Sequence, residues 1–164
     1  MNTTTINVVL DPVDQALASG LKDLWFPICP STFVKDNPVC LRRLGYKIAL
    51  WRDQNGQVHA LEDHCPHRGA PLSMGVILGD RIACPYHGVE VREDGTVTRV
   101  PGSPGCKLEG SRPTRRFHVH ESHGAIFLFN ATDPHLDQAP PLVLPEQLTS
   151  PEWSSFLCYV EWGC

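Results

Sequence analysis

The feature that most constrains this chain is a pair of short motifs, Cys65-Pro-His67 and Cys84-Pro-Tyr-His87, separated by sixteen residues. Written as a formula, the arrangement is C-x-H-x16-C-x2-H. Thiolates and imidazoles are the side chains with which proteins bind zinc and iron–sulfur clusters. Each motif contains proline, which restricts the backbone and stiffens a loop. The pattern therefore predicts two matched loops that hold one metal centre between them.

The spacing is compatible with two kinds of metal centre, zinc and an iron–sulfur cluster. A pair of loops that binds no metal is the third possibility. Zinc binds Cys2His2 sets in tetrahedral sites, usually with like ligands paired on one short knuckle. Here each loop supplies one ligand of each kind, so its cysteine can bind one iron and its histidine the other. Such mixed ligation is that of a Rieske [2Fe–2S] cluster. The alternation favours this cluster, with structural zinc as the alternative.

Composition narrows the class of protein. With 164 residues, of which 41% are hydrophobic, the chain is long enough for one domain with its own core. A formal net charge of −4 gives no electrostatic footprint for nucleic acid. We find no apolar run of membrane-spanning length and no secretory signal at the N-terminus. We therefore expect a soluble, cytoplasmic protein that binds neither nucleic acid nor membrane.

The other five cysteines lie apart from any histidine at ligand spacing. Seven cysteines in all is an odd number, which does not favour a disulfide scaffold. We interpret the five as small buried side chains or idle thiols. They are Cys29, Cys40, Cys106, Cys158 and Cys164.

Short β-type runs separated by turn residues predict an all-β fold, an antiparallel sandwich or barrel. Asn55-Gly56 and Asp94-Gly95 are strong hairpin turns, because both dipeptides accept the positive φ that tight turns need. One short helix is predicted near the N-terminus, in the segment 11–25. The expected strand runs are VCLRRL (39–44), KIALWRD (47–53), QVHALED (57–63), RIACPY (81–86), VEVRED (89–94), TVTRV (96–100), RRFHVHE (115–121) and AIFLFN (125–130).

The chain divides into three parts by composition. We expect a lead-in with the short helix at 1–23, the metal-binding domain at 24–132, and a proline-rich irregular arm with a final β-type run at 133–164. The final run ends without a partner strand, which we interpret as a cut before a further domain.

The motifs "CPHRGAPLS" and "CPYHG" resemble the signature of the Rieske proteins. Their flanks, from Leu24 to Asn130, are similar to the N-terminal domain of Rieske non-haem iron oxygenases, which hydroxylate aromatic rings or demethylate related compounds. The similarity covers about two thirds of the chain. It implies a Rieske-type β-sandwich or barrel that carries a small cluster-binding subdomain of two loops.

The resemblance also implies a set of site residues. Cys65 and Cys84 would bind the buried iron of the cluster, and His67 and His87 the outer one. Around them, Arg68 would place positive charge near the reduced cluster, and Tyr86 would direct its hydroxyl toward a sulfur or ligand. Gly69 and Gly88 would make turns that bring backbone N–H groups toward the sulfurs.

Three residues depart from the high-potential Rieske proteins of respiratory complexes. Those proteins carry an extra cysteine in each loop and a serine after the second His-Gly, whereas this chain has Ala70, Tyr86 and Val89. Fewer hydrogen bonds to the sulfurs disfavour the reduced state, so we expect a potential near the low end of the Rieske range. Oxygenases commonly have tryptophan where Val89 stands.

A second histidine cluster, His118, His120 and His123, lacks a carboxylate at usable spacing, so we interpret it as a sheet-face pair and a turn residue. Oxygenases of the resembling family also hold a mononuclear Fe(II) on two histidines and a carboxylate. No such segment is found in this sequence, so we expect that iron in a missing catalytic domain.

The resemblance thus implies electron transfer as the cluster-bearing part of an oxidoreductase, with no turnover by this segment alone. Its partners would be a reductase or ferredoxin as donor and the mononuclear-iron domain of a neighbouring subunit in a homo-oligomer. A free-standing Rieske ferredoxin is the alternative. The substrate is not readable from these residues.

Overall fold

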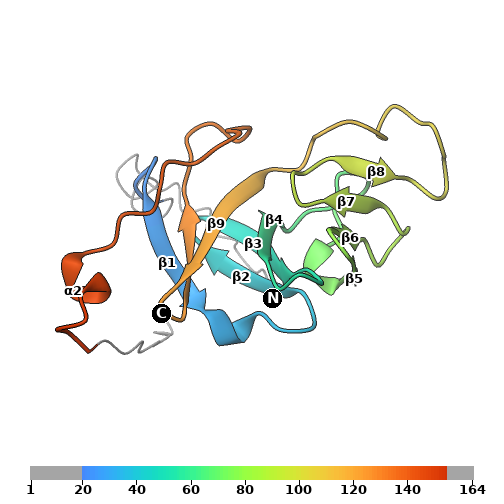
Figure 1. The fold of residues 1–164 in the computed structure, drawn as a ribbon. Coiled ribbons are helices and arrows are strands. Elements are labelled where there is room, and N and C mark those ends of the chain that lie inside the picture. The colour runs from blue at the N-terminus through green and yellow to red at the C-terminus, as the bar shows by residue number, and fades with distance from the viewer. Residues whose placement is uncertain (1–19, 155–164) are drawn as a thin grey trace, which may run out of the picture.

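The structure, a computed structural model, describes residues 20–154, and in this range ten strands form two antiparallel sheets (Figure 1). The expectation of an antiparallel all-β fold is therefore confirmed. No helix within the described range is long and apolar enough to cross a membrane.

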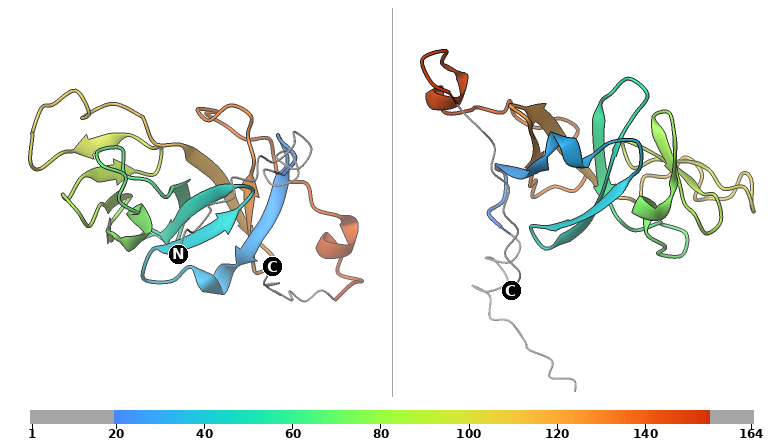
Figure 2. Two further views of the ribbon diagram at one scale, coloured as in Figure 1. Left: turned by 180° about the vertical axis from the view of Figure 1, so that it is seen from behind. Right: turned by 90° about the horizontal axis from the view of Figure 1, so that it is seen from below.

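The larger sheet is curled into a half-barrel and has the order β1-β10-β9-β4-β3-β2 (Figures 1 and 2). The hairpin turn between β3 and β4 forms at Asn55-Gly56 as predicted, with Gly56 at φ 81°. The Asp53 carboxylate accepts the backbone N–H of Asn55 and of Gln57, which fixes that turn. The strands are β1 (Trp25–Pro30), β2 (Val39–Arg43), β3 (Tyr46–Arg52), β4 (Val58–Glu62), β9 (Arg116–Ser122) and β10 (Ala125–Phe129).

The smaller sheet is inserted between β4 and β9, in the order β5-β6-β7-β8. It lies at one end of the molecule, and the proline-rich arm lies at the opposite end (Figure 2, right). Its strands are β5 (Val76–Leu78), β6 (Arg81–Ala83), β7 (Glu90–Arg92) and β8 (Val97–Arg99). This insertion contains both cysteine–histidine motifs.

Two hydrophobic cores lie on opposite faces of β3 and β4. Along β3, Ile48 and Leu50 face the interior of the half-barrel, while Ala49 and Trp51 face the smaller sheet. All four are fully buried, which explains why this strand is a continuous apolar run in the sequence. The second core also contains Leu61 of β4, the two motif cysteines, and inner side chains of the smaller sheet and its loops: Cys65, Leu72, Ile82, Cys84, Val89, Val91, Val97 and Val100.

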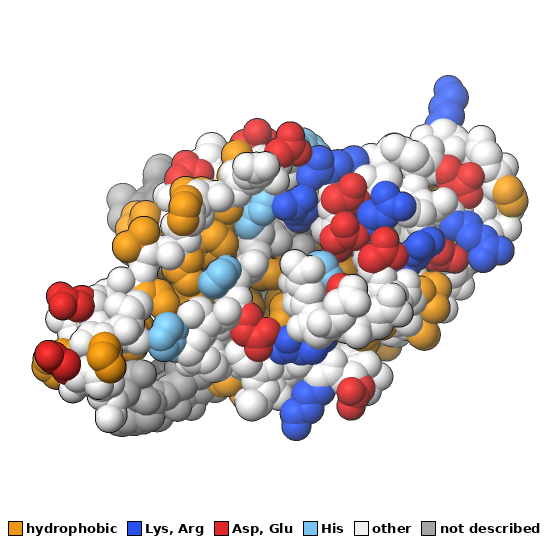
Figure 3. Space-filling model, viewed as in Figure 1, with side chains coloured by type: hydrophobic (Ala, Val, Ile, Leu, Met, Phe, Trp, Pro, Cys, Tyr) orange, Lys and Arg blue, Asp and Glu red, His pale blue; other side chains and the backbone are white. Residues whose placement is uncertain are grey.

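Ion pairs cover the outer side of the smaller sheet. The Glu90 carboxylate on β7 lies 3.4 Å from Arg81 Nη1 on β6 and 3.3 Å from Arg99 Nη1 on β8. Asp80 pairs with Arg81 and with Arg92. Figure 3 shows acidic and basic side chains intermixed over this end of the molecule. Strands β6, β7 and β8 therefore follow the apolar-in, polar-out pattern of a half-buried sheet.

The structure differs from the sequence-based expectation in a few elements. β1 and β5 were not predicted, because β1 contains Pro27 and Pro30 and β5 has only three residues. Pro27 is accommodated because β1 is an edge strand with a register shift between Pro27 and Cys29. The arm, predicted to be irregular, contains one helical turn, α2 (Glu146–Thr149). The N-terminal helix falls mostly outside the described residues, and 20–24 are not helical; the final run from residue 155 also lies outside them.

Candidate metal centre

The two cysteine–histidine loops, CPHRGA and CPYHGV, have the same backbone hydrogen bonds. In the first, Cys65 N donates to Ala70 O and Gly69 N donates to Cys65 O, both at 2.8 Å. In the second, Cys84 N donates to Val89 O at 2.8 Å and Gly88 N to Cys84 O at 3.0 Å. The loops are thus two copies of one conformation, although the histidine is the third residue of the first and the fourth of the second.

Glycine is required at the same place in both loops. Gly69 has φ 74° and Gly88 has φ 67°, a region that other residues seldom adopt. A Cβ on Gly69 would approach the His64 ring to 3.1 Å, and one on Gly88 would approach Pro101 to 3.3 Å. Both glycines therefore close their loops, and their own N–H groups bond to cysteine carbonyls.

Cysteine and histidine are separated by depth. Cys65 and Cys84 are 2% and 3% exposed and belong to the second core, whereas His67 and His87 are exposed. The two imidazole rings lie 4.8 Å apart between centroids, at an angle of 67°. The site therefore has a buried pair of thiols below an exposed pair of rings, which is the depth order that the resemblance predicts for its ligands.

Two effects act on the Cys65 thiol. Burial raises its pKa, and the nearby Cys84 side chain acts in the same direction. The backbone N–H groups of His67 and Arg68 donate toward its sulfur and lower the pKa. These N–H groups favour the thiolate form, which is the form that binds iron. Metal binding at this site would release protons.

The donor set fits two metal ions better than one. Within residues 20–154, no group of three or more His, Cys, Asp or Glu side chains is arranged to hold a single ion. The donors instead form two pairs, thiol with thiol and ring with ring. A tetrahedral zinc needs all four at one point, whereas a [2Fe–2S] cluster takes two at each iron.

The predicted neighbours of the ligands lie at the surface. Tyr86 is 62% exposed, and its ring lies 3.8 Å from the His87 ring between centroids, at 32°. Arg68 is exposed on the first loop. Val89 is fully buried, and Ala70 packs against the same core. Of the three positions where respiratory Rieske proteins have a hydroxyl or thiol group, this chain thus has a buried valine at one, a partly buried alanine at the second and an exposed tyrosine at the third.

A third loop, at 100–109, contacts the second motif. Pro101 lies against Gly88, as the 3.3 Å approach to a Cβ there shows. The Glu109 carboxylate accepts the N–H of Val100 at 2.6 Å and of Gly105 at 2.7 Å, which holds the loop closed. A glutamate shortly after the run PGSPG is the only signal that the sequence offers for this brace.

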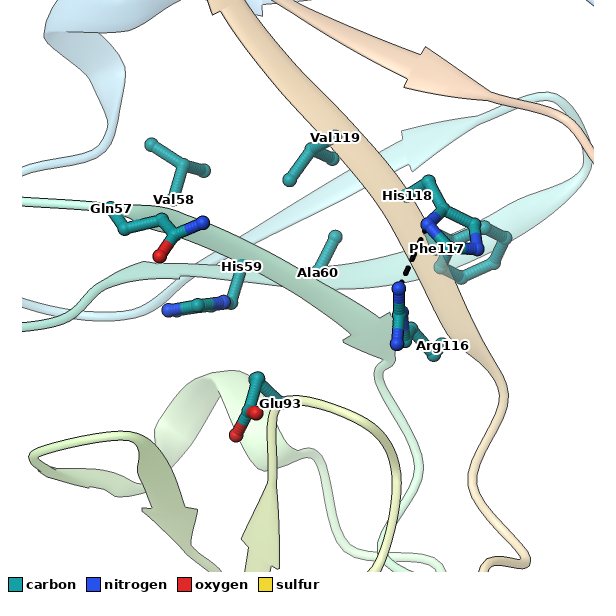
Figure 4. Close-up of a pocket in the computed structure, with 9 residues that line it drawn as sticks. All are labelled: Gln57, Val58, His59, Ala60, Glu93, Arg116, Phe117, His118 and Val119. Atoms are coloured by element: carbon teal, nitrogen blue, oxygen red, sulfur yellow. Dashed lines mark hydrogen bonds between the residues drawn. The ribbon is translucent and has the colours of Figure 1, made fainter. Parts of the chain in front are cut away.

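The other histidines have structural partners. His118 lines a polar hollow of about 280 Å³ between the two sheets (Figure 4). Arg116 lies 2.9 Å from its Nδ1, and its Nε2 lies 2.8 Å from the carbonyl of Leu136 in the arm. Burial lowers the pKa of His118, which suits a neutral ring that accepts from Arg116 and donates to Leu136. His120 stacks edge-on against Trp25, 6.4 Å between centroids, and His123 lies in the β9–β10 turn.

The comparison with known families decides the identity of the centre. A family profile described as "Rieske [2Fe-2S] domain" matches residues 24–118, more than half of the chain. This chain belongs to the Rieske [2Fe–2S] domain family. Its cofactor is therefore a Rieske cluster and not zinc.

Relatives of this Rieske domain include several oxygenase components. The chain is 32% identical over 133 residues to the vanillate O-demethylase oxygenase subunit of Pseudomonas sp., covering 81% of this chain and 36% of that protein. It superimposes on dicamba monooxygenase with a TM-score of 0.68 and 28% identity, over 81% of this chain and 40% of that one. A complex between the oxygenase and ferredoxin of carbazole 1,9a-dioxygenase gives a TM-score of 0.66 and 25% identity, over 76% of this chain and 32% of the matched chain. The chain thus spans between 32% and 40% of these relatives, and the resemblance to Rieske oxygenases is confirmed.

Proposed function

We propose that this chain transfers single electrons through a Rieske cluster bound by Cys65, Cys84, His67 and His87. The observation that carries the proposal is the layered site, with two buried thiols beneath two exposed rings. Bound there, the cluster would supply a one-electron couple whose potential its ligands and their hydrogen bonds adjust.

The chain's own residues would shield the cluster from water and provide a route for the electron to the surface. The second core encloses the thiols and keeps water from them, whereas the His67 and His87 rings reach the surface, where a partner protein can dock. Prolines 66, 71 and 85 and the matched hydrogen bonds of the two loops restrain the ligands. A site that moves little between oxidation states exchanges electrons with a small reorganisation cost.

We further propose that the chain is the N-terminal part of a terminal oxygenase that hydroxylates or demethylates an aromatic or related compound with O2. The names of the relatives support this, since they are oxygenase components. In that setting a reductase or ferredoxin would reduce the cluster. The electron would pass to mononuclear iron in a catalytic domain of a neighbouring subunit, within a cytoplasmic homo-oligomer.

The proline-rich arm supports the proposed division of the chain into 24–132 and 133–164. It also favours the proposal that the chain is part of an oxygenase over the alternative of a free-standing ferredoxin. It runs back along the larger sheet, where Pro140 O accepts a hydrogen bond from Trp25 Nε1 at 3.0 Å. Asp137 pairs with Arg112, and Leu136 O contacts His118. An arm held in this way can fix the position of whatever follows it.

Spectroscopy tests the cluster and its ligands. The anaerobically purified protein should be red-brown, contain two iron atoms and two inorganic sulfides per chain, and give a rhombic EPR signal with average g below 2 after dithionite. His67→Ala or His87→Ala should change or abolish this signal. Stoichiometric zinc without visible absorbance would overturn the proposal.

The reduction potential is a separate prediction. With Val89 fully buried at the place of a serine hydroxyl, we expect a value near the low end of the Rieske range, about −150 mV. Protein-film voltammetry near neutral pH measures it. Val89→Ser, which adds a donor beside the second loop, should raise the potential. A clearly positive potential in the parent protein would contradict the expectation.

A further inference from the structure

Asp63 joins the two ends of the first cysteine–histidine loop. Its Oδ1 accepts the Ser73 backbone N–H and its Oδ2 accepts the Ser73 hydroxyl, both at 2.7 Å. Residues 63 and 73 flank the segment that contains Cys65 and His67. The residue is only 7% exposed, so these bonds are largely shielded from water. We call this pair of hydrogen bonds the Asp63 clasp.

Asp63 is itself fixed to the larger sheet. It follows the last residue of β4 directly, and its backbone N–H donates to Lys47 O on β3 at 2.8 Å. Ser73 lies in the 3-10 turn Leu72–Met74, next to the fully buried Leu72. The clasp therefore attaches the far end of the loop to the same strands that support its beginning.

A carboxylate is well suited to this position. Hydrogen bonds to an ionised acceptor are about twice as strong as neutral ones. Burial raises the pKa of the Cys40 thiol on the edge strand β2, and the Asp63 carboxylate acts in the same direction. Removing the carboxylate would leave the partly buried amide and hydroxyl of Ser73 without their acceptor. The loop end would then be free to move away from β4.

We propose that Asp63 is a positioning residue that sets the first loop, and through it Cys65 and His67, for cluster binding. This inference rests on the ligand set given under Proposed function. Without the clasp, the loop is held at its cysteine end by the Cys65–Ala70 bond but is no longer fastened at Ser73. The exposed His67 ring, which the core does not hold, would be the ligand most displaced.

The chain contains a matched control far from the cluster. Asp23 accepts the Thr132 N–H at 2.9 Å and the Thr132 hydroxyl at 2.8 Å, which is the same chemistry joining the lead-in to the segment after β10. Asp23→Ala therefore removes a clasp of the same chemistry at an exposed site, without touching either cysteine–histidine loop. Its effect reports what the loss of such a contact does to the domain in general.

The test compares the parent chain with Asp63→Ala, Ser73→Ala, Ser73→Thr and Asp23→Ala. EPR of the reduced protein, the rate of cluster loss to a chelator, and amide hydrogen exchange in 65–73 are measured for each. We expect Asp63→Ala to shift or broaden the EPR signal, to lose its cluster roughly 10–100-fold faster, and to speed exchange at Gly69. Ser73→Ala should show smaller changes of the same kind, and Ser73→Thr, which keeps both donors, should match the parent.

Asp23→Ala should keep the parent's EPR signal and rate of cluster loss. If Asp63→Ala and Ser73→Ala also keep them, the inference is wrong, and equal changes in Asp23→Ala would reduce Asp63 to a general structural role. If Asp63→Ala does not fold, the comparison of Ser73→Ala with Ser73→Thr decides. A parent protein without a cluster signal would overturn the proposed function instead, while faster exchange at Gly69 in Asp63→Ala would still report the clasp.

Discussion

Replacing Cys65 or Cys84 with serine should abolish the visible colour of the protein and lower its melting temperature. Serine is close in size to cysteine, so the change removes a metal ligand and leaves little cavity. Both side chains lie within the second core, and cluster binding is coupled to the folding of their loops. Visible absorption, iron content and thermal unfolding measure the two effects.

Two other cysteines serve as controls for this prediction. Cys29 is buried in the half-barrel core, and Cys106 packs against the second core without a place in either motif. Burial raises the pKa of Cys29 to about 11, so its thiol stays protonated. Cys29→Ala should cost some stability but leave the spectrum intact, as should Cys106→Ala. If Cys106 were needed for colour and Cys84 were not, the ligand assignment would be wrong.

Gly75→Ala should strongly destabilise the cluster-binding end of the domain. A Cβ at this position would lie 2.2 Å from Ala83 O and 2.9 Å from Leu72 O, both backbone atoms. The main chain must move at Ala83, the residue before Cys84. We expect a loss of about 3 kcal/mol, which lowers the melting temperature by roughly 6–12 °C for a domain of this size. The rate of cluster loss should rise with it.

Gly102→Ala is the matched control, because a Cβ at Gly102 meets no atom within 4 Å. Its effect on the unfolding free energy should stay within about 0.5 kcal/mol. Thermal and chemical unfolding of both variants check the pair. Equal melting temperatures for Gly75→Ala and the parent would show that β5 and β6 are not packed as closely as described.

The sequence predicts those strands whose own residues show an apolar pattern. Eight runs with alternating or continuous apolar residues correspond to strands, and the glycine dipeptides mark their turns, because both depend on local chemistry. β1 and β5 escape prediction since their pairing is a tertiary effect. The division of the strands into two sheets is also not local, because β4 pairs with β9 across the whole insertion.

In the candidate site, too, the sequence predicts what depends on local pattern and not what depends on tertiary contacts. Motif spacing identifies the four proposed ligands, and their depth in the fold agrees with the order that the resemblance implies. Asp63, Ser73 and Glu109 could not be identified, because a carboxylate before a loop is usually a solvated surface residue. Only the folded chain shows that Ser73 donates to Asp63 with both its amide and its hydroxyl.

The burial of β3 and β4 on both faces has a consequence for protein engineering. The inner side of the cluster-binding insertion is completed by Ala49, Trp51 and Leu61, which belong to the half-barrel. Grafted onto a foreign scaffold by its loop ends alone, the insertion would expose that apolar side to solvent and fail to shelter its thiols. A functional graft would have to include β3 and β4, so that their side chains cover the apolar side of the insertion.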